Sequence, residues 1–183
     1  MSLEKNSQLK FTLNYGAILG AVFVILAIIF YIAGMDAANS RWTQWLYYAI
    51  MIGMIIYAIK TYRDEYLGGA INYAHALGTG VLVVLFGSLI YAVYTYFFLA
   101  FVDSSIIEKT LLAAEEDMIN RGMSDAEIDQ AMSLTRSFMS NPAIIALFMV
   151  ASFVFFGFIF SLIISLLMKK EPADTFDTET SEV

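Results

Sequence analysis

The sequence predicts an all-α, polytopic membrane protein with four transmembrane helices and an extramembrane helical hairpin between the third and the fourth. The chain has 183 residues, of which 60% are hydrophobic, whereas a soluble domain has about 45–50%. The excess gathers in four blocks, each long enough to cross a hydrocarbon core of about 30 Å, which takes about 20 helical residues. The one sizeable polar region lies at residues 104–139. We therefore expect a single membrane domain over residues 1–170.

Each expected span is bounded by polar or charged residues. The first apolar run is too long for a cleavable signal core, which takes about 7–15 residues, and no small-x-small cleavage site follows it. The second run stops at Lys60, and Gly68 and Gly69 break the segment that precedes the third. Pro142 suits the first turn of the fourth helix, where a missing N–H does no harm. The spans are expected at residues 13–33, 42–60, 73–101 and 142–168.

The polar region carries the signals of two short helices. Ser105 with Glu108, and Ser124 with Glu127, match the S-x-x-E capping box, in which side chains satisfy the free amide donors of a helix start. Gly122 between them suits a helix stop. We expect a hairpin outside the hydrocarbon, with one apolar stripe on each helix. The stripes consist of Ile107, Leu111, Ala114 and Met118, and of Ile128, Met132, Thr135 and Phe138. Residues 171–183 are acidic, and we expect them to be disordered.

The distribution of Lys and Arg near the span ends predicts the orientation. Six basic residues fall on the side of both termini, and four on the side of the hairpin. This bias favours a multi-pass protein of the inner (plasma) membrane with both termini in the cytoplasm and the hairpin outside.

The stretch between Lys60 and Gly80 holds the most polar chemistry. His75 is the single histidine, and a histidine at a span end can relay protons, bind metal or sense pH. The alternative is a boundary histidine bonded to backbone or lipid, which we favour because metal sites need three or four ligands. Tyr62, Arg63 and Asp64 could contact a partner or an anionic lipid headgroup. The alternative is a loop that sets topology, which we also favour because basic residues flank spans in any case.

Small residues four apart predict close helix packing. Gly16 and Gly20 have this spacing in the first span, and Ala49 and Gly53 in the second. In the fourth span, Gly157, Ser161 and Ser165 repeat the four-residue spacing. Gly78 and Gly80 are expected on the inner face of the third helix.

Several classes of function are disfavoured. No Asp, Glu, Lys or Arg lies at mid-depth in a span, where ion-coupled carriers usually keep one. The net charge is −7, and nucleic-acid binding needs a basic patch. There is no cysteine, and the alternating Asp125, Glu127 and Asp129 lack the turn glycine and closing glutamate of a calcium loop. We expect no enzyme, cofactor or metal site.

The order of these features resembles domain-of-unknown-function family 4199, which comprises small bacterial membrane proteins. The resemblance covers residues 8–170 and rests mainly on the stretch from Lys60 to Gly80. Its other elements are a polar hairpin, Pro142, Gly157 and the Lys169–Lys170 stop. The family implies the four-span fold and brings no established activity, so no catalytic residue follows from it.

The hypothesis that the sequence favours is a non-enzymatic envelope protein that assembles with itself or with a membrane-protein partner in the lipid bilayer. Its candidate contacts are the acidic hairpin and residues 60–65. An oligomeric permease for a small solute or ion is the alternative. A water-filled cleft lined by polar residues would favour the permease, and a tightly packed, dry bundle with an exposed apolar stripe from Ile107 to Met118 would favour the assembly protein.

Overall fold

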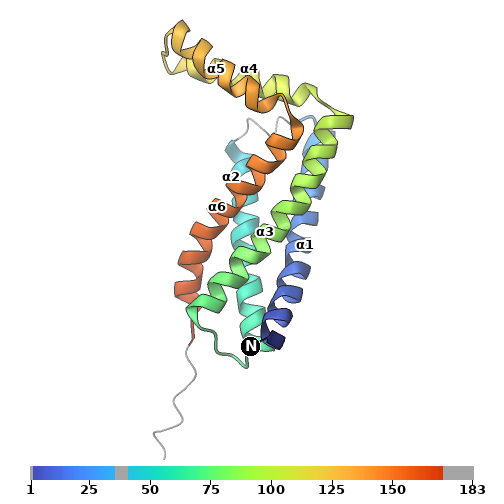
Figure 1. Ribbon diagram of the computed structural model, residues 1–183, viewed down its shortest axis with the longest axis vertical. Coiled ribbons are helices and arrows are strands. Elements are labelled where there is room, and N and C mark those ends of the chain that lie inside the picture. The colour runs from blue at the N-terminus through green and yellow to red at the C-terminus, as the bar shows by residue number, and fades with distance from the viewer. Residues whose placement is uncertain (1, 36–40, 171–183) are drawn as a thin grey trace, which may run out of the picture.

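The described part of the chain forms a bundle of long helices, and a pair of shorter helices projects from one end of the bundle (Figure 1). The computed structural model describes residues 2–35 and 41–170, so the expected disordered tail at residues 171–183 lies outside the described residues. The bundle consists of α1 (Ser2–Ile32), α2 (Arg41–Thr61), α3 (Tyr73–Phe97) and α6 (Pro142–Met168). The projecting pair is α4 (Ser105–Asn120) and α5 (Asp125–Met139). The all-α, polytopic class is confirmed.

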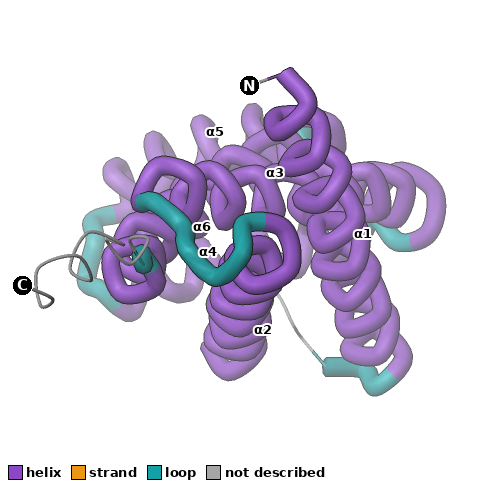
Figure 2. Tube along the Cα trace, turned by 90° about the horizontal axis from the view of Figure 1, so that it is seen from below, coloured by secondary structure: helices purple, strands orange, loops and turns teal. Residues whose placement is uncertain are grey.

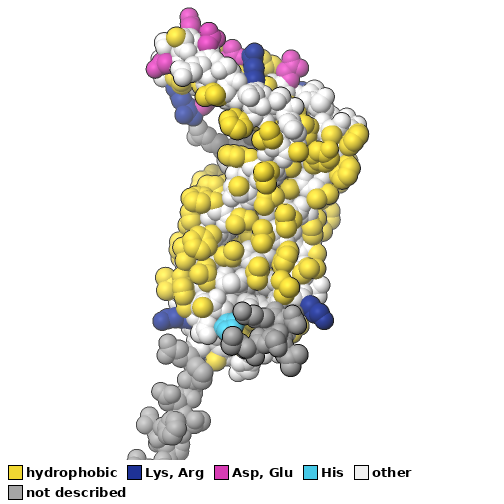
Figure 3. Space-filling model, viewed as in Figure 1, with side chains coloured by type: hydrophobic (Ala, Val, Ile, Leu, Met, Phe, Trp, Pro, Cys, Tyr) yellow, Lys and Arg dark blue, Asp and Glu magenta, His cyan; other side chains and the backbone are white. Residues whose placement is uncertain are grey.

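Within residues 2–35 and 41–170, four helical stretches are long and apolar enough to cross a membrane. They comprise Ser7–Ile32, Trp42–Tyr66, Tyr73–Val102 and Pro142–Met168. Hydrophobic side chains cover the middle of the bundle on the face seen in Figure 3, while acidic side chains gather on the hairpin. Apolar side chains occupy most sides of these helices because lipid tails and the protein core are equally apolar. Hydropathy therefore identifies the spans, but it does not determine which faces of the helices pack against one another.

The third helix lies at the centre of the bundle. It packs extensively against α1 on one side and α6 on the other, and less extensively against α2, as the end-on view in Figure 2 shows. The fully buried Leu19, Met51, Ile55, Val83 and Val84 fill the space between the helices. We call the end that carries α4 and α5 the hairpin end. The opposite end, where α1 begins and α6 ends, is the terminal end.

The second helix continues past its expected stop at Lys60. A π-helical turn, η1 (Tyr62–Tyr66), extends it, so the expected topology-setting loop at residues 60–65 is helical. The cause is Tyr62, whose side chain is only 1% exposed. Its ring lies 5.1 Å from the ring of Phe11 and stacks 5.5 Å from that of Tyr66. A second π-helical turn, η2 (Phe98–Val102), similarly extends α3.

At the terminal end, a glycine turn joins η1 to α3. Gly68 and Gly69 have φ angles of +64° and +93°, a region that side chains with a Cβ disfavour. Ile71 then pairs with Lys170 through two backbone hydrogen bonds of 2.9 and 3.0 Å. This antiparallel bridge fixes the start of α3 beside the end of α6.

The hairpin forms at the expected residues, but one of its two expected caps is different. The backbone N–H of Ser124 donates to Glu127 Oε2 at 2.9 Å, as a capping box requires, and Gly122 has φ +75° in the turn. At the start of α4, however, Asp103 Oδ1 accepts from the N–H and the hydroxyl of Ser105 at 2.9 and 2.6 Å. The expected capping box of Ser105 is therefore wrong, because Asp103 is the capping acceptor.

Candidate functional site

Glycines bring α1 against α3 at close range. A Cβ atom at Gly16 would lie 2.5 Å from Phe86 Cβ, and one at Gly20 would lie 2.7 Å from Ile90 Cβ. Gly87 on α3 makes the reciprocal contact, since its Cβ would lie 3.0 Å from Leu19 Cγ. Real Cβ atoms do not approach so closely, so the crossing requires glycine. The glycine spacing on α1 predicted this contact, whereas Gly87 was not among the predicted packing residues.

A second close crossing joins α3 to α6. A Cβ atom at Gly157 would lie 2.6 Å from Val84 Cγ1, and one at Gly80 would lie 2.5 Å from Ser161 Oγ. Gly78 is looser, because its Cβ would meet only Gln8 Nε2 at 3.5 Å. A Cβ at Gly53 would meet nothing within 4 Å. The expected helix contact at Gly53 is therefore wrong within the chain, since this residue lies on an exposed side of α2.

His75 lies half-buried in the first turn of α3, within a small polar cluster at the terminal end. Its Nδ1 atom is 3.0 Å from Asn72 Oδ1, which also accepts from the His75 backbone N–H at 2.9 Å. Gln8 Nε2 donates to the His75 carbonyl at 3.2 Å and to Thr79 Oγ1 at 3.0 Å. These bonds tie the start of α3 to α1. The described residues place no group of three or more metal-ligating side chains together.

Arg63 and Asp64 form an ion pair at the surface of η1. Arg63 Nε lies 2.7 Å from Asp64 Oδ1. Tyr62 points instead into the bundle, where it packs as described above. Of the three residues predicted as contacts, Tyr62 is buried in the bundle. Only the Arg63–Asp64 ion pair lies at the surface, where it could contact lipid or a partner.

A cavity opens at the hairpin end. It has a volume of about 660 Å³ and is lined by residues of all four long helices and of both hairpin helices, within the range of about 300–1,000 Å³ usual for small-molecule sites. Four tyrosines line it together with apolar side chains and with Asp103, Lys109 and Thr110. The tyrosines are Tyr31, Tyr47, Tyr91 and Tyr94. No pattern in the sequence indicated this site, because its residues come from six different α-helices.

A smaller cavity of about 250 Å³ adjoins the first. The two share Tyr47, Tyr91 and Met149, and the smaller one also reaches Gln44 and Ser152. The hydroxyls of Tyr47 and Tyr91 lie 3.4 Å apart, at the upper end of hydrogen-bond range. The arrangement offers an aromatic, weakly polar site.

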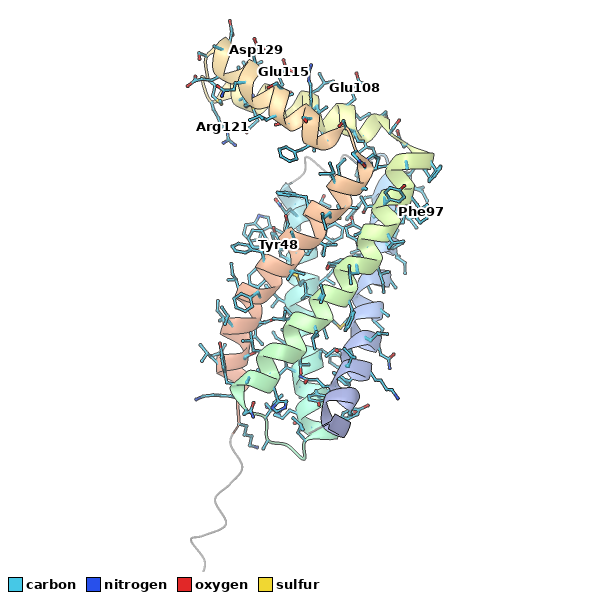
Figure 4. All side chains as sticks on the ribbon, viewed as in Figure 1. Tyr48, Phe97, Glu108, Glu115, Arg121 and Asp129 are labelled. Carbon is cyan, nitrogen blue, oxygen red and sulfur yellow. The ribbon has the colours of Figure 1, made fainter. Side chains whose placement is uncertain are left out.

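The hairpin has two different faces. On α4, Glu108, Leu112, Glu115 and Ile119 share one side at helical spacing, and Glu115 forms an ion pair of 3.6 Å with Arg136 on α5. Figure 4 shows Glu108, Glu115 and Asp129 on the side away from the bundle and Arg121 on the other side. We call the first side the distal face. The opposite side, with Ala131, Leu134 and Phe138 on α5, is the bundle-side face.

The expected stripes lie mostly between the two helices of the hairpin. Ile107, Leu111 and Met118 are half-buried, while Ile128 and Met132 are buried. Four large apolar side chains of the hairpin are exposed instead. They comprise Leu112 and Ile119, both 59% exposed, on the distal face, and Leu134 at 58% and Phe138 at 64% on the bundle-side face. Spacing predicted where the hairpin closes on itself, but not which residues remain at its surface.

Four apolar helices in a glycine-packed bundle, with a polar hairpin at one end, define a multi-pass membrane protein. The comparison with family models adds the family. The model described as "Protein of unknown function (DUF4199)" matches residues 14–170, so the chain belongs to this family. A search of the curated proteins and a search of the solved structures each found no match.

Proposed function

We propose that this chain is a non-enzymatic assembly protein of the bacterial inner membrane, which binds a partner protein through the distal face of its hairpin. The observation that carries the proposal is the exposure of Leu112 and Ile119 outside the spans, on the same side as Glu108 and Glu115. Exposed apolar side chains with a charged rim are the composition of a protein interface.

Charge indicates the chemistry of that partner. Residues 103–139 carry eight acidic and three basic side chains, and the acidic ones gather along the upper edge of the hairpin in Figure 3. Complementary potentials accelerate association and suppress wrong partners. The proposed partner therefore presents an apolar patch surrounded by Lys and Arg.

The bundle supports an anchoring role. Its middle is filled by fully buried apolar side chains, and glycine contacts hold α1 and α6 tightly against α3. A charged group at mid-depth, which most ion-coupled carriers need, is missing from the sequence of all four spans. A rigid bundle of this kind suits a protein that positions the hairpin at the membrane surface.

The proposed orientation puts both termini in the cytoplasm and the hairpin outside. At the terminal end, Lys60, Arg63, Lys169 and Lys170 lie close to the ends of their helices. Basic side chains close to span ends are the ones that set orientation. The basic residues of the hairpin, by contrast, lie within a longer acidic segment.

Affinity purification from native membranes in a mild detergent tests the proposed interface. The test protein carries Leu112→Ser and Ile119→Ser, and the matched control carries Leu134→Ser, which changes an equally exposed leucine on the other face. We expect a stoichiometric partner with wild type and control, and its loss with the test protein. Equal retention by all three, or purification of the chain alone, would contradict the proposal.

One observation favours the alternative of a small-solute permease. The two adjoining cavities extend from the hairpin end into the bundle and are lined by tyrosine hydroxyls, Gln44 and Ser152, so they could admit a solute from one side. Release on the other side would require the glycine crossings to open. Solute flux into liposomes that contain the purified chain would support the permease, and its loss on Met149→Trp would assign the path to the cavities.

A further inference from the structure

The bundle-side face of the hairpin exposes apolar side chains at the level where the spans end. Phe138 lies four residues before the first residue of α6, and Leu134 lies one helical turn further out. At about 100° per residue, both are roughly on the opposite side of α5 from Asp129. Leu134 and Phe138 remain 58% and 64% exposed, because the hairpin extends sideways beyond the bundle (Figure 1).

Both ends of the hairpin are fixed close to the membrane surface. α4 begins at Ser105, three residues after the third candidate span ends at Val102, and α5 ends at Met139, three residues before the fourth begins at Pro142. The pair then runs across the end of the bundle rather than along its axis (Figure 1). One face of the hairpin is consequently turned toward the bilayer and the other toward water.

We propose that the bundle-side face of the hairpin is seated on the bilayer, with Leu134 and Phe138 inserted at the boundary between phospholipid headgroups and acyl chains. Helices with an apolar and a charged face take this position in membranes. The occupant of the apolar face is thus the phospholipid of the surrounding leaflet. The distal face, on which the proposed function depends, is a separate surface.

Charge along the hairpin agrees with this position. The apolar residues of the bundle-side face lie near its base, while Asp117 and Arg121 form an ion pair near its tip. In Figure 1 the hairpin rises away from the bundle toward that tip. The apolar part therefore lies deepest, and the charged tip lies among headgroups and water, where the Arg121 side chain, on the bundle side in Figure 4, can reach lipid phosphate.

Single-cysteine labelling of the full chain tests the proposal, since the sequence contains no native cysteine. Leu134→Cys and Phe138→Cys are compared with Leu112→Cys, whose position is exposed to the same extent on the distal face. Each variant is labelled with a polarity-sensitive nitrobenzoxadiazole dye and reconstituted in vesicles of phosphatidylethanolamine and phosphatidylglycerol. Some vesicles contain phospholipid with a nitroxide near the top of its acyl chain. Helical content and gel-filtration profile verify that each variant is folded.

We expect blue-shifted emission and strong nitroxide quenching at positions 134 and 138, and water-like, weakly quenched emission at position 112. Similar water-like emission at 134 and 112 would overturn the proposal. Blue-shifted emission at 134 without quenching by lipid nitroxide would also overturn it, because protein would then cover this face. Equal quenching at 134 and 112 would refute the difference between the faces. The emission at position 112 is measured in a separate variant. A negative result at positions 134 and 138 therefore does not contradict the proposed partner interface on the distal face.

Discussion

Replacing Gly157 by alanine adds one methyl group at the crossing of α6 and α3. The new Cβ would lie 2.6 Å from Val84 Cγ1 and 2.9 Å from Val84 Cγ2 and Cβ, whereas carbon atoms pack at about 3.5–4.0 Å. Each contact is therefore too short by roughly 1 Å, and the valine cannot rotate all three atoms away. The helices must separate or the side chain must strain, which costs about 1–3 kcal/mol in a packed core.

Gly53→Ala is the matched control, since its Cβ would meet nothing within 4 Å. Alanine there should be neutral or slightly stabilising, because glycine costs a helix about 0.5–1 kcal/mol relative to alanine. The free energy of unfolding is measured by titrating purified protein with sodium dodecyl sulfate in mixed micelles, followed by circular dichroism. We expect Gly157→Ala to be less stable than Gly53→Ala by an amount that Val84→Ala partly restores. Equal stability of the two variants would refute the packing argument.

Three further predictions concern the two ends of the bundle. Cysteine at Ala126 should react with an impermeant thiol reagent applied to intact cells and cysteine at Ala74 should not; the reverse pattern would invert the proposed orientation. The N-cap hydrogen bonds, led by the serine hydroxyl, lower the pKa of Glu127. The stabilisation of the hairpin by these hydrogen bonds is present at neutral pH and is lost as the pH falls through the lowered pKa of Glu127. Circular dichroism should therefore show a loss of hairpin helicity at acidic pH, and this loss should depend less steeply on pH in Glu127→Gln. Gln8→Ala and Thr79→Val should show a coupling of about 0.5–1.5 kcal/mol in a double-mutant cycle, and strict additivity would exclude their hydrogen bond.

The positions of the helices were predictable because they depend on local chemistry. A bilayer accepts only long apolar helices with satisfied backbones, so hydropathy identified the spans. The hairpin was found because polar sequence, Gly122 and the box of Ser124 and Glu127 are signals that act within a few residues. Asp103 was not predicted as the cap of α4, because it lies before the S-x-x-E pattern that starts at Ser105.

Contacts between helices were less predictable. Small residues four apart occur at Gly16, where α3 approaches closely, and at Gly53, where nothing approaches. The spacing shows only that another helix can approach closely. The rotation of each helix about its own axis determines whether the small residues face a neighbouring helix. Burial of Tyr62 by Phe11 likewise depends on α1 meeting η1, and the tyrosine-lined cavity depends on six α-helices at once. No window of sequence contains that information.

Photo-crosslinking in living cells tests the central claim most directly, namely that the distal face of the hairpin binds a partner protein. A benzophenone amino acid is incorporated at position 112 on the distal face, or at position 134 on the bundle-side face. The account predicts that Leu112→benzophenone yields one discrete protein adduct and that Leu134→benzophenone does not. Absence of any protein adduct at 112, or the same adduct from both positions, would contradict it.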